Sequence, residues 1–120
     1  MRNLCDKYGI LLVLDDVRTF GRLSVHGSHR FFGFRPDMAI YSKALGNGYA
    51  ISTCLGIDAL KKASMEVFLT GSCWNDALSM TAALVSLRIL KRDDVASEVS
   101  NKGALFAKGM ENLAKEYDYS

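Results

Sequence analysis

The sequence predicts an α/β fold with a mostly parallel sheet and covering helices. Two observations indicate this class: short, continuous apolar runs end in polar residues, and two longer segments with helical periodicity follow them. A continuous apolar run of strand length is typical of a strand buried on both faces, as in a parallel sheet covered by helices. Three such strands need partners and cover that this chain has trouble providing. The sequence therefore predicts an incomplete α/β sheet.

The first third of the chain predicts one helix, one buried strand and one long loop. Residues 1–8 are interpreted as the end of a helix that Gly9 terminates. Ile10–Leu14 is the first continuous apolar run and predicts a strand that ends at two carboxylates. Residues 17–36 are rich in glycine and predict a loop, with a short helix near Arg30–Phe34. A loop of this length in a compact domain is usually functional.

The middle of the chain predicts two more strands and a short helix. Met38–Tyr41 follows a Pro-Asp break and predicts the second strand, and Ile51–Ile57 predicts the third. Between them, residues 44–48 form a turn rich in residues that tolerate a positive φ angle. Asp58–Ser64 predicts a short helix, and Val67–Leu69 a short strand or extended piece.

Two longer helices are predicted after residue 74. Asn75 or Asp76 can cap a helix that runs to about Leu90 and has so little polar surface that we expect it to be largely buried. Asp93 or Asp94 caps the last helix, whose apolar residues have helical spacing and predict an amphipathic element that lies on another surface. Those apolar residues are Val95, Val99, Phe106, Met110, Leu113 and Tyr117.

Composition and charge exclude several classes of protein. The net charge is only +2, which gives no sign of a nucleic-acid or anionic membrane partner. The cysteines Cys5, Cys54 and Cys73 are widely spaced and odd in number, which argues against a disulfide framework and a cysteine-based zinc site. No apolar run approaches the roughly 18 residues of a membrane span, and no secretory signal is present. We therefore expect a soluble, cytoplasmic protein.

Other site types find little support in the sequence. His26 and His29 lie in a glycine-rich loop without a third ligand at a proper spacing, so no metal site is predicted. The turn at residues 46–48 has neither the P-loop pattern nor the dinucleotide-binding glycine pattern, and nucleotide binding is therefore rejected.

Three places in the chain carry groups that suit one kind of cofactor chemistry. Asp15 follows the first strand, Lys43 follows the second, and Thr70–Trp74 precedes a capped helix. A pyridine-type electron sink needs an acid on its ring nitrogen and a lysine that holds its aldehyde as an imine. A phosphate group needs hydroxyls and backbone N–H groups at a turn. Two plain alternatives remain: the aspartates could merely end a strand, and Lys43 could be an ordinary surface lysine.

The motifs at these places resemble the class-III aminotransferases. The run from Leu4 to Arg22, with Asp15-Asp16-Val17 at its centre, is similar to the family's Asp-Glu-Val segment, and its Asp-Asp-Val-Arg-Thr form is similar to the glutamate-1-semialdehyde aminomutase-like branch. Arg35–Tyr49 resembles the family's Pro-Asp…Lys…Gly signature, and Thr70–Trp74 its Thr-Gly-Ser/Thr-aromatic loop. The resemblance extends over nearly the whole chain.

This resemblance implies a fold, a cofactor and a set of site residues. The fold would be part of the large domain of the fold type I transferases, and the cofactor pyridoxal 5'-phosphate (PLP). Asp15 would pair with the pyridinium nitrogen, Val17 would pack against the ring, and Lys43 would form the Schiff base and then move the proton. Ser72 would hydrogen-bond the phosphate, in that family typically from the neighbouring subunit, which implies a homodimer. The reaction would be transfer of an amino group between small molecules.

Several departures from the family pattern leave the substrate open. The second acid is Asp16 rather than glutamate, and Thr19–Arg22 reads Thr-Phe-Gly-Arg where the branch reads Thr-Gly-Phe-Arg. Residues 47–50 lack the usual proline, and residues 75–77 replace a commoner small-polar stretch. The resemblance does not distinguish an aminotransferase from a 2,1-aminomutase.

The resemblance also implies that parts of the enzyme are missing from this sequence. Residues 1–91 would form a partial PLP-binding large domain, and residues 92–120 a helix leading toward the small carboxy-terminal domain. The family's phosphate cup and ring-stacking aromatic residue would lie upstream, so we expect a fragment. The alternatives are a catalytically inert piece, at most structural or part of a subunit interface, and an unrelated small α/β binding module indifferent to PLP.

Overall fold

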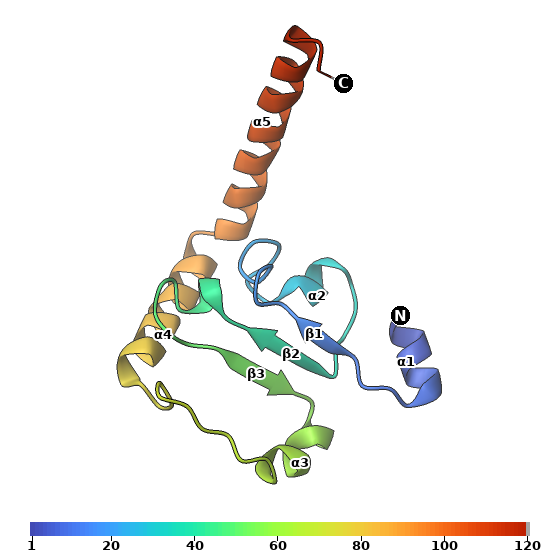
Figure 1. Ribbon diagram of the computed structural model, residues 1–120, viewed down its shortest axis with the longest axis vertical. Coiled ribbons are helices and arrows are strands. Elements are labelled where there is room, and N and C mark those ends of the chain that lie inside the picture. The colour runs from blue at the N-terminus through green and yellow to red at the C-terminus, as the bar shows by residue number, and fades with distance from the viewer. Residues whose placement is uncertain (120) are drawn as a thin grey trace.

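A three-stranded sheet with the order β1-β2-β3 forms the centre of the structure (Figure 1). The computed structural model describes residues 1–119. The strands are β1 (Val13–Asp15), β2 (Met38–Tyr41) and β3 (Thr53–Gly56). β1 and β2 are parallel, whereas β3 is antiparallel to β2. The predicted parallel order thus applies to the first pair. The β2–β3 connection contains only the 3-10 turn Lys43–Leu45, and it lacks the helical crossover that parallel pairing requires.

The helices lie close to the ranges that the sequence predicts. They are α1 (Arg2–Tyr8), α2 (Ser28–Phe31), α3 (Lys61–Met65), α4 (Ala77–Arg92) and α5 (Val95–Glu116), with a 3-10 turn at Asp58–Leu60 before α3. Gly9 ends α1 in the left-handed conformation with a φ angle of 63°, as predicted for a helix stop. Residues 67–69 form no helix or strand, so the predicted short strand is absent there.

The predicted cap of the first long helix is confirmed, and the residue is Asp76. Its Oδ2 atom accepts a hydrogen bond from the backbone N–H of Ser79 at 2.9 Å. Hydrogen bonds from the hydroxyl and N–H groups of Ser79 lower the pKa of Asp76 below its ordinary range. Asp94 occupies the cap position of α5, but its side chain makes no capping hydrogen bond.

A small core lies between the sheet, the loop after β1 and helix α4. Its buried members are Phe20, Ala39, Tyr41, Leu45 and Ala83. The rings of Phe20 and Tyr41 meet edge to face, with centroids 5.1 Å apart. The core therefore joins the loop that follows β1 to the end of β2, where the candidate site residues lie.

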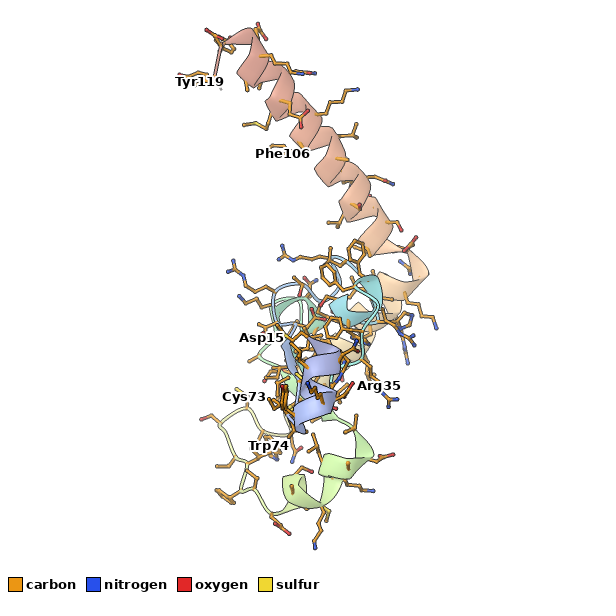
Figure 2. All side chains as sticks on the ribbon, turned by 90° about the vertical axis from the view of Figure 1, so that its right-hand side faces the viewer. Asp15, Arg35, Cys73, Trp74, Phe106 and Tyr119 are labelled. Carbon is orange, nitrogen blue, oxygen red and sulfur yellow. The ribbon has the colours of Figure 1, made fainter. Side chains whose placement is uncertain are left out.

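Two expectations are wrong for this structure: that α4 is largely buried, and that α5 lies with its apolar stripe on another surface. Helix α4 buries only Ser79 and Ala83, and α5 buries none of its residues. Figure 1 and Figure 2 show α5 extending away from the sheet, and Phe106 on it is 71% exposed. The apolar patterns are real, but the other residues of the described chain do not reach these faces.

The strand faces and the overall dimensions also show that apolar surface is exposed. Val13 of β1 is 49% exposed although the apolar run predicted burial on both faces. The solvent-accessible surface is 9555 Å², whereas a compact chain of this mass exposes roughly 6,400 Å². The radius of gyration is 18.4 Å, compared with about 14 Å for a compact domain of this length. A large apolar surface thus lacks cover within residues 1–119.

None of the helices in the described part of the chain combines the length and the apolar character that crossing a membrane requires.

Candidate functional site

Asp15 and Lys43 lie at the same end of the sheet. Asp15 is the last residue of β1 and stands opposite Ile40 of β2 in the parallel register. Lys43 follows the end of β2 by two residues. Because the carboxyl ends of parallel strands meet at one edge, the register places Asp15 and Lys43 at the same end of the sheet. We call this edge the carboxyl end of the sheet.

Asp15 is exposed and tied only to its own loop. Its Oδ1 atom accepts a hydrogen bond from the backbone N–H of Val17 at 3.1 Å. This local turn orients the carboxylate and leaves its second oxygen without a partner among residues 1–119. Val17 itself is half-buried. The two residues that the family resemblance would place at one cofactor ring are therefore linked by a hydrogen bond.

Lys43 has an unusual backbone conformation for a non-glycine residue. Its φ angle is 47°, in the left-handed region that costs energy for an L-residue with a long side chain. The conformation is held from both sides. The carbonyl of Lys43 accepts N–H groups from Gly46 at 3.1 Å and Asn47 at 2.9 Å, and the hydroxyl of Ser42 donates to the carbonyl of Ile51 at 3.0 Å. The lysine side chain is exposed and belongs to none of the ion pairs within residues 1–119.

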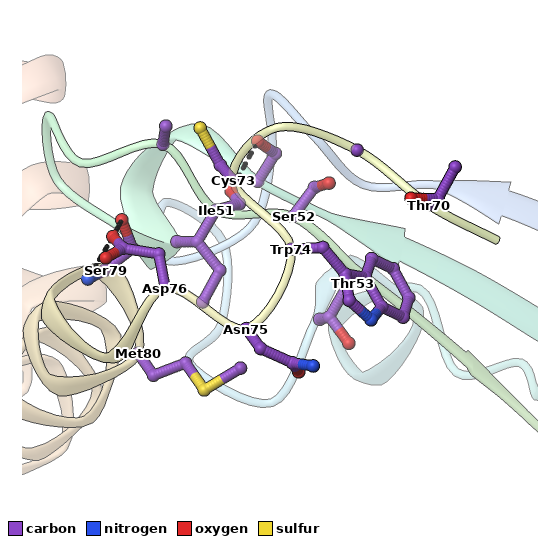
Figure 3. Close-up of a pocket in the computed structure, with 13 residues that line it drawn as sticks. Ile51, Ser52, Thr53, Thr70, Cys73, Trp74, Asn75, Asp76, Ser79 and Met80 are labelled. Atoms are coloured by element: carbon purple, nitrogen blue, oxygen red, sulfur yellow. Dashed lines mark hydrogen bonds between the residues drawn. The ribbon is translucent and has the colours of Figure 1, made fainter.

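A cavity of about 690 Å³ lies beside this end of the sheet, between the start of β3, the loop before α4 and the first turn of α4 (Figure 3). Its wall includes hydroxyl groups together with apolar side chains. The lining residues are Ser42, Ala50, Ile51, Ser52, Thr53, Thr70, Gly71, Cys73, Trp74, Asn75, Asp76, Ser79 and Met80. The structure thus brings the predicted Thr70–Trp74 loop next to Ser42, the neighbour of Lys43.

The cavity does not enclose all of the predicted site residues. Ser72 belongs to the same exposed loop but does not line the cavity, and neither do Asp15 and Lys43. No lysine or arginine lines it, and its one carboxylate, Asp76, is engaged by Ser79. The cavity therefore offers hydroxyl and backbone groups beside the lysine but no cation of its own.

Asp16 has a larger part in the structure than the sequence indicated. Its side chain is completely buried, and its Oδ2 atom accepts the backbone N–H of Ser28 at 2.8 Å. The hydroxyl of Thr19 donates to its Oδ1 atom. Burial raises the pKa of Tyr41, and the charge of Asp16 raises it further. The spacing of an aspartate and a threonine three residues later was the one local signal that could have indicated this role.

The opposite end of the sheet also holds an aspartate, in a different setting. Asp37, just before β2, accepts the backbone N–H of Leu12 and pairs with the guanidinium group of Arg2, each through its Oδ2 atom at 2.7 Å. The N–H of Leu12 and then the guanidinium group of Arg2 lower the pKa of Asp37 below its ordinary range. No local sequence pattern indicates this pair, because its residues are 35 positions apart.

Comparison with known proteins gives a single family. The family model "Aminotransferase class-III" matches residues 1–120. The aminopentol aminotransferase of Sphingopyxis macrogoltabida is 37% identical over 97% of this chain and 28% of its own length. The glutamate-1-semialdehyde 2,1-aminomutase of Sulfurihydrogenibium azorense is 30% identical over 98% of this chain and 28% of its own length.

Solved structures give the same answer for the fold. The PLP internal aldimine form of the FumI protein from Sphingopyxis sp. MTA144 has a TM-score of 0.92 and 35% identity over 98% of this chain and 28% of that one. N-acetylornithine aminotransferase from Stenotrophomonas maltophilia K279a has a TM-score of 0.81 and 29% identity over 98% and 30%. The chain thus spans less than a third of the length of these relatives. The match overturns the alternative of an unrelated binding module. The chain belongs to the class-III aminotransferase family and has the α/β fold of its PLP-dependent members.

Proposed function

We propose that this chain carries the lysine and the ring acid of a PLP-dependent aminotransferase or 2,1-aminomutase, with Lys43 as the point of covalent attachment. One observation supports this most directly. Asp15 and Lys43 lie at the carboxyl end of adjacent parallel strands, and neither is neutralised by an ion pair within the described chain. The left-handed backbone of Lys43 adds support, because such strain is concentrated at functional sites.

The groups at this end of the sheet fit the chemical demands of PLP. An exposed carboxylate, Asp15, suits the ring nitrogen, and an exposed primary amine, Lys43, suits the aldehyde. Hydroxyls and backbone N–H groups of the Thr70–Trp74 loop, Ser72 among them, suit the phosphate. When bound, PLP supplies an electron sink that stabilises negative charge at the substrate carbon.

In this proposal Asp15, Lys43 and Val17 each have a distinct role. The carboxylate of Asp15 would hold a proton on the ring nitrogen, which would keep the ring electron-withdrawing. The Nζ atom of Lys43 would take a proton from the substrate carbon and return one nearby. Val17 is half-buried beside Asp15 and would shield the ring face from water.

The substrate and the partner are proposals as well. The relatives act on aminopentol, on 3-aminobutyryl-CoA and on glutamate-1-semialdehyde, as their names say, so a small amino compound is the proposed substrate class. A second copy of the protein is the proposed partner, supported by the uncovered apolar surface of the sheet and helices. The cytoplasm is the proposed location, in keeping with three free cysteines.

We retain the domain division of the sequence analysis as part of this proposal. Residues 1–91 contain the sheet, the lysine and the acid, and residues 92–120 contain α5, which projects from them. An uncovered amphipathic helix in that position is suited to connecting the PLP-binding part to a further domain.

Reduction with borohydride in the presence of PLP tests the proposal. The amine of Lys43 condenses with the aldehyde, losing water, and hydride then fixes the bond, so peptide mass mapping should find the label at Lys43. The Lys43→Ala variant should lose that label, and the control Lys61→Ala, in exposed α3, should keep it. Label scattered over exposed lysines in the unmodified protein would contradict the assignment.

A second candidate is a chain that binds PLP without turnover. The exposure of Asp15 and Lys43 favours it, because neither residue lines the cavity beside the sheet. Specific label at Lys43 combined with no consumption of amino donors, including glutamate and simple amines, would select this candidate over the first.

A further inference from the structure

We propose that Asp16 is a positioning residue that sets Asp15 and Lys43 relative to one another from inside the fold. The inference rests on the proposed function, since it assumes that Asp15 and Lys43 form the proposed PLP site. Among the described residues Asp16 is the one large side chain that is completely buried. A buried carboxylate is costly unless it is fully hydrogen-bonded, so its partners indicate what it organises.

The contacts of Asp16 reach three separate segments. Its backbone N–H donates to the carbonyl of Ile40 on β2 at 3.0 Å, and its own carbonyl accepts the N–H of Phe20 at 3.0 Å. Its carboxylate accepts the N–H of Ser28 at the start of α2 and the hydroxyl of Thr19. One residue therefore closes the loop between β1 and α2 and attaches it to the neighbouring strand.

These contacts include both segments that carry the proposed chemistry. On one side Asp16 lies between Asp15 and Val17, whose own hydrogen bond spans it. On the other side it binds the strand that leads through Tyr41 to Lys43. A shift of Asp16 would consequently change the spacing between the ring acid and the lysine.

The loop approaches Tyr41 so closely that only glycine fits at position 27. Gly27 has a φ angle of 96°, and a Cβ atom there would lie 2.7 Å from Nδ1 of His29 and 2.9 Å from the hydroxyl of Tyr41. The return of the loop to the Asp16 carboxylate is therefore fixed by contact as well as by hydrogen bonds. Tight packing of this kind transmits a small displacement instead of absorbing it.

Asp16 stands where the family that the sequence resembles has the longer glutamate. The structure explains why the shorter side chain suits this position. The carboxylate is enclosed by the Ser28 N–H group and the Thr19 hydroxyl with no exposed surface. An added methylene would push it against these donors, and overpacking of a closed site forces shifts of the backbone. Asp16→Glu should therefore disturb the site although it keeps the charge.

The experiment compares PLP labelling and the absorbance of the lysine-bound cofactor across pH in a series of variants. Thr19→Val removes one donor to Asp16 at nearly constant shape, and Asp16→Ala removes the acceptor. Asp16→Asn retains acceptor capacity for the Ser28 N–H group while its amide can donate to the Thr19 hydroxyl, which serves as the conservative rescue. Asp37→Asn is the matched control, because it removes a hydrogen-bonded carboxylate at the opposite end of the same sheet.

We expect Asp16→Ala to lower the preference for Lys43 over other lysines by about tenfold to a hundredfold, as for a misplacement of about 1 Å. Its pH–absorbance curve should move in the direction seen for Asp15→Asn, Thr19→Val should move it less, and Asp16→Asn should restore most of it. Asp37→Asn should leave that curve unchanged even if it lowers the melting temperature.

Two outcomes separate the inference from the proposal on which it rests. If the unmodified protein shows no preferred label at Lys43, the proposed function fails. If the unmodified protein labels specifically and Thr19→Val and Asp16→Ala label with the same preference and the same pH–absorbance curve, the positioning role fails and the proposed function stands. Should Asp16→Ala not fold, Thr19→Val decides the question alone.

Discussion

The two ends of the sheet use charged residues in opposite ways. At the end where β2 begins, Asp37 is held by the N–H group of Leu12 and the guanidinium group of Arg2. At the end where β1 and β2 finish, Asp15 and Lys43 are exposed and form no ion pair within the described chain. One sheet thus has one end whose charges are paired and another whose charges are free.

This difference separates structural charges from charges available for chemistry. A carboxylate that already accepts two strong hydrogen bonds, one of them from a guanidinium group, is stabilised as an anion and has little capacity for a ligand. A carboxylate and an amine without partners can bind one, and their positions must then be maintained by other means. At the carboxyl end those means are the buried Asp16 and the Phe20–Tyr41 contact.

The largest expected effect comes from comparing one substitution at each end of the sheet. Lys43→Ala should abolish PLP labelling at that peptide and leave the free energy of unfolding within about 0.5 kcal/mol, because the side chain is exposed and unpaired. Arg2→Ala should lower the melting temperature and keep the label. Denaturant unfolding and peptide mass mapping on both variants measure the two quantities, and a destabilised Lys43→Ala protein would break the comparison.

The next effect concerns the packing beneath the free end. Phe20 is buried and meets Tyr41 edge to face, so Phe20→Ala should reduce the free energy of unfolding by about 3 kcal/mol. It should also broaden the label over other lysines, since the loop after Asp15 loses its anchor. Chemical denaturation followed by circular dichroism gives the first number, and Phe31→Ala, at an exposed ring, is the control that should cost little.

Lowering the pH should first remove the contribution of Asp37 and its partners to the stability of the fold. The pKa of Asp37 lies below its ordinary value of 3.8, so the folded protein holds this group as an anion more strongly than the unfolded chain does. Its contribution to stability is present above about pH 4 and is lost as the pH falls through the lowered pKa. The melting temperature of Asp37→Asn should consequently depend less on pH in this range than that of the unmodified protein. Parallel curves for the two proteins would contradict the assignment.

The smallest effect on stability should come from replacing the exposed carboxylate of Asp15. Asp15→Asn removes an exposed carboxylate, and asparagine can still accept the Val17 N–H group, so the melting temperature should change by no more than about 2 °C. The absorbance of bound PLP should respond to pH differently, because the ring nitrogen loses its acid. An unchanged pH–absorbance curve would remove Asp15 from the proposed site.

Several features of this protein could be predicted because their causes lie in adjacent residues. The Gly9 helix stop, the Asp76 cap, the Met38–Tyr41 strand and the order of elements all follow from local chemistry. The positions of Asp15 at the end of one strand and of Lys43 just after the next could also be read from the local pattern of each segment. Local patterns identify such features without knowledge of the rest of the fold.

Other features depend on contacts between distant residues, and only the tertiary structure decided them. The Arg2–Asp37 pair and the reach of Asp16 to Ser28 arise because the sheet register brings separate segments together. The exposure of α4 and α5 could not be predicted from the sequence either. An apolar stripe indicates that a helix face tends to be buried, but not whether residues 1–119 supply the partner that buries it. The sequence by itself identified the residues of the proposed site, whereas the packing of the chain determined which of them are left without partners among residues 1–119.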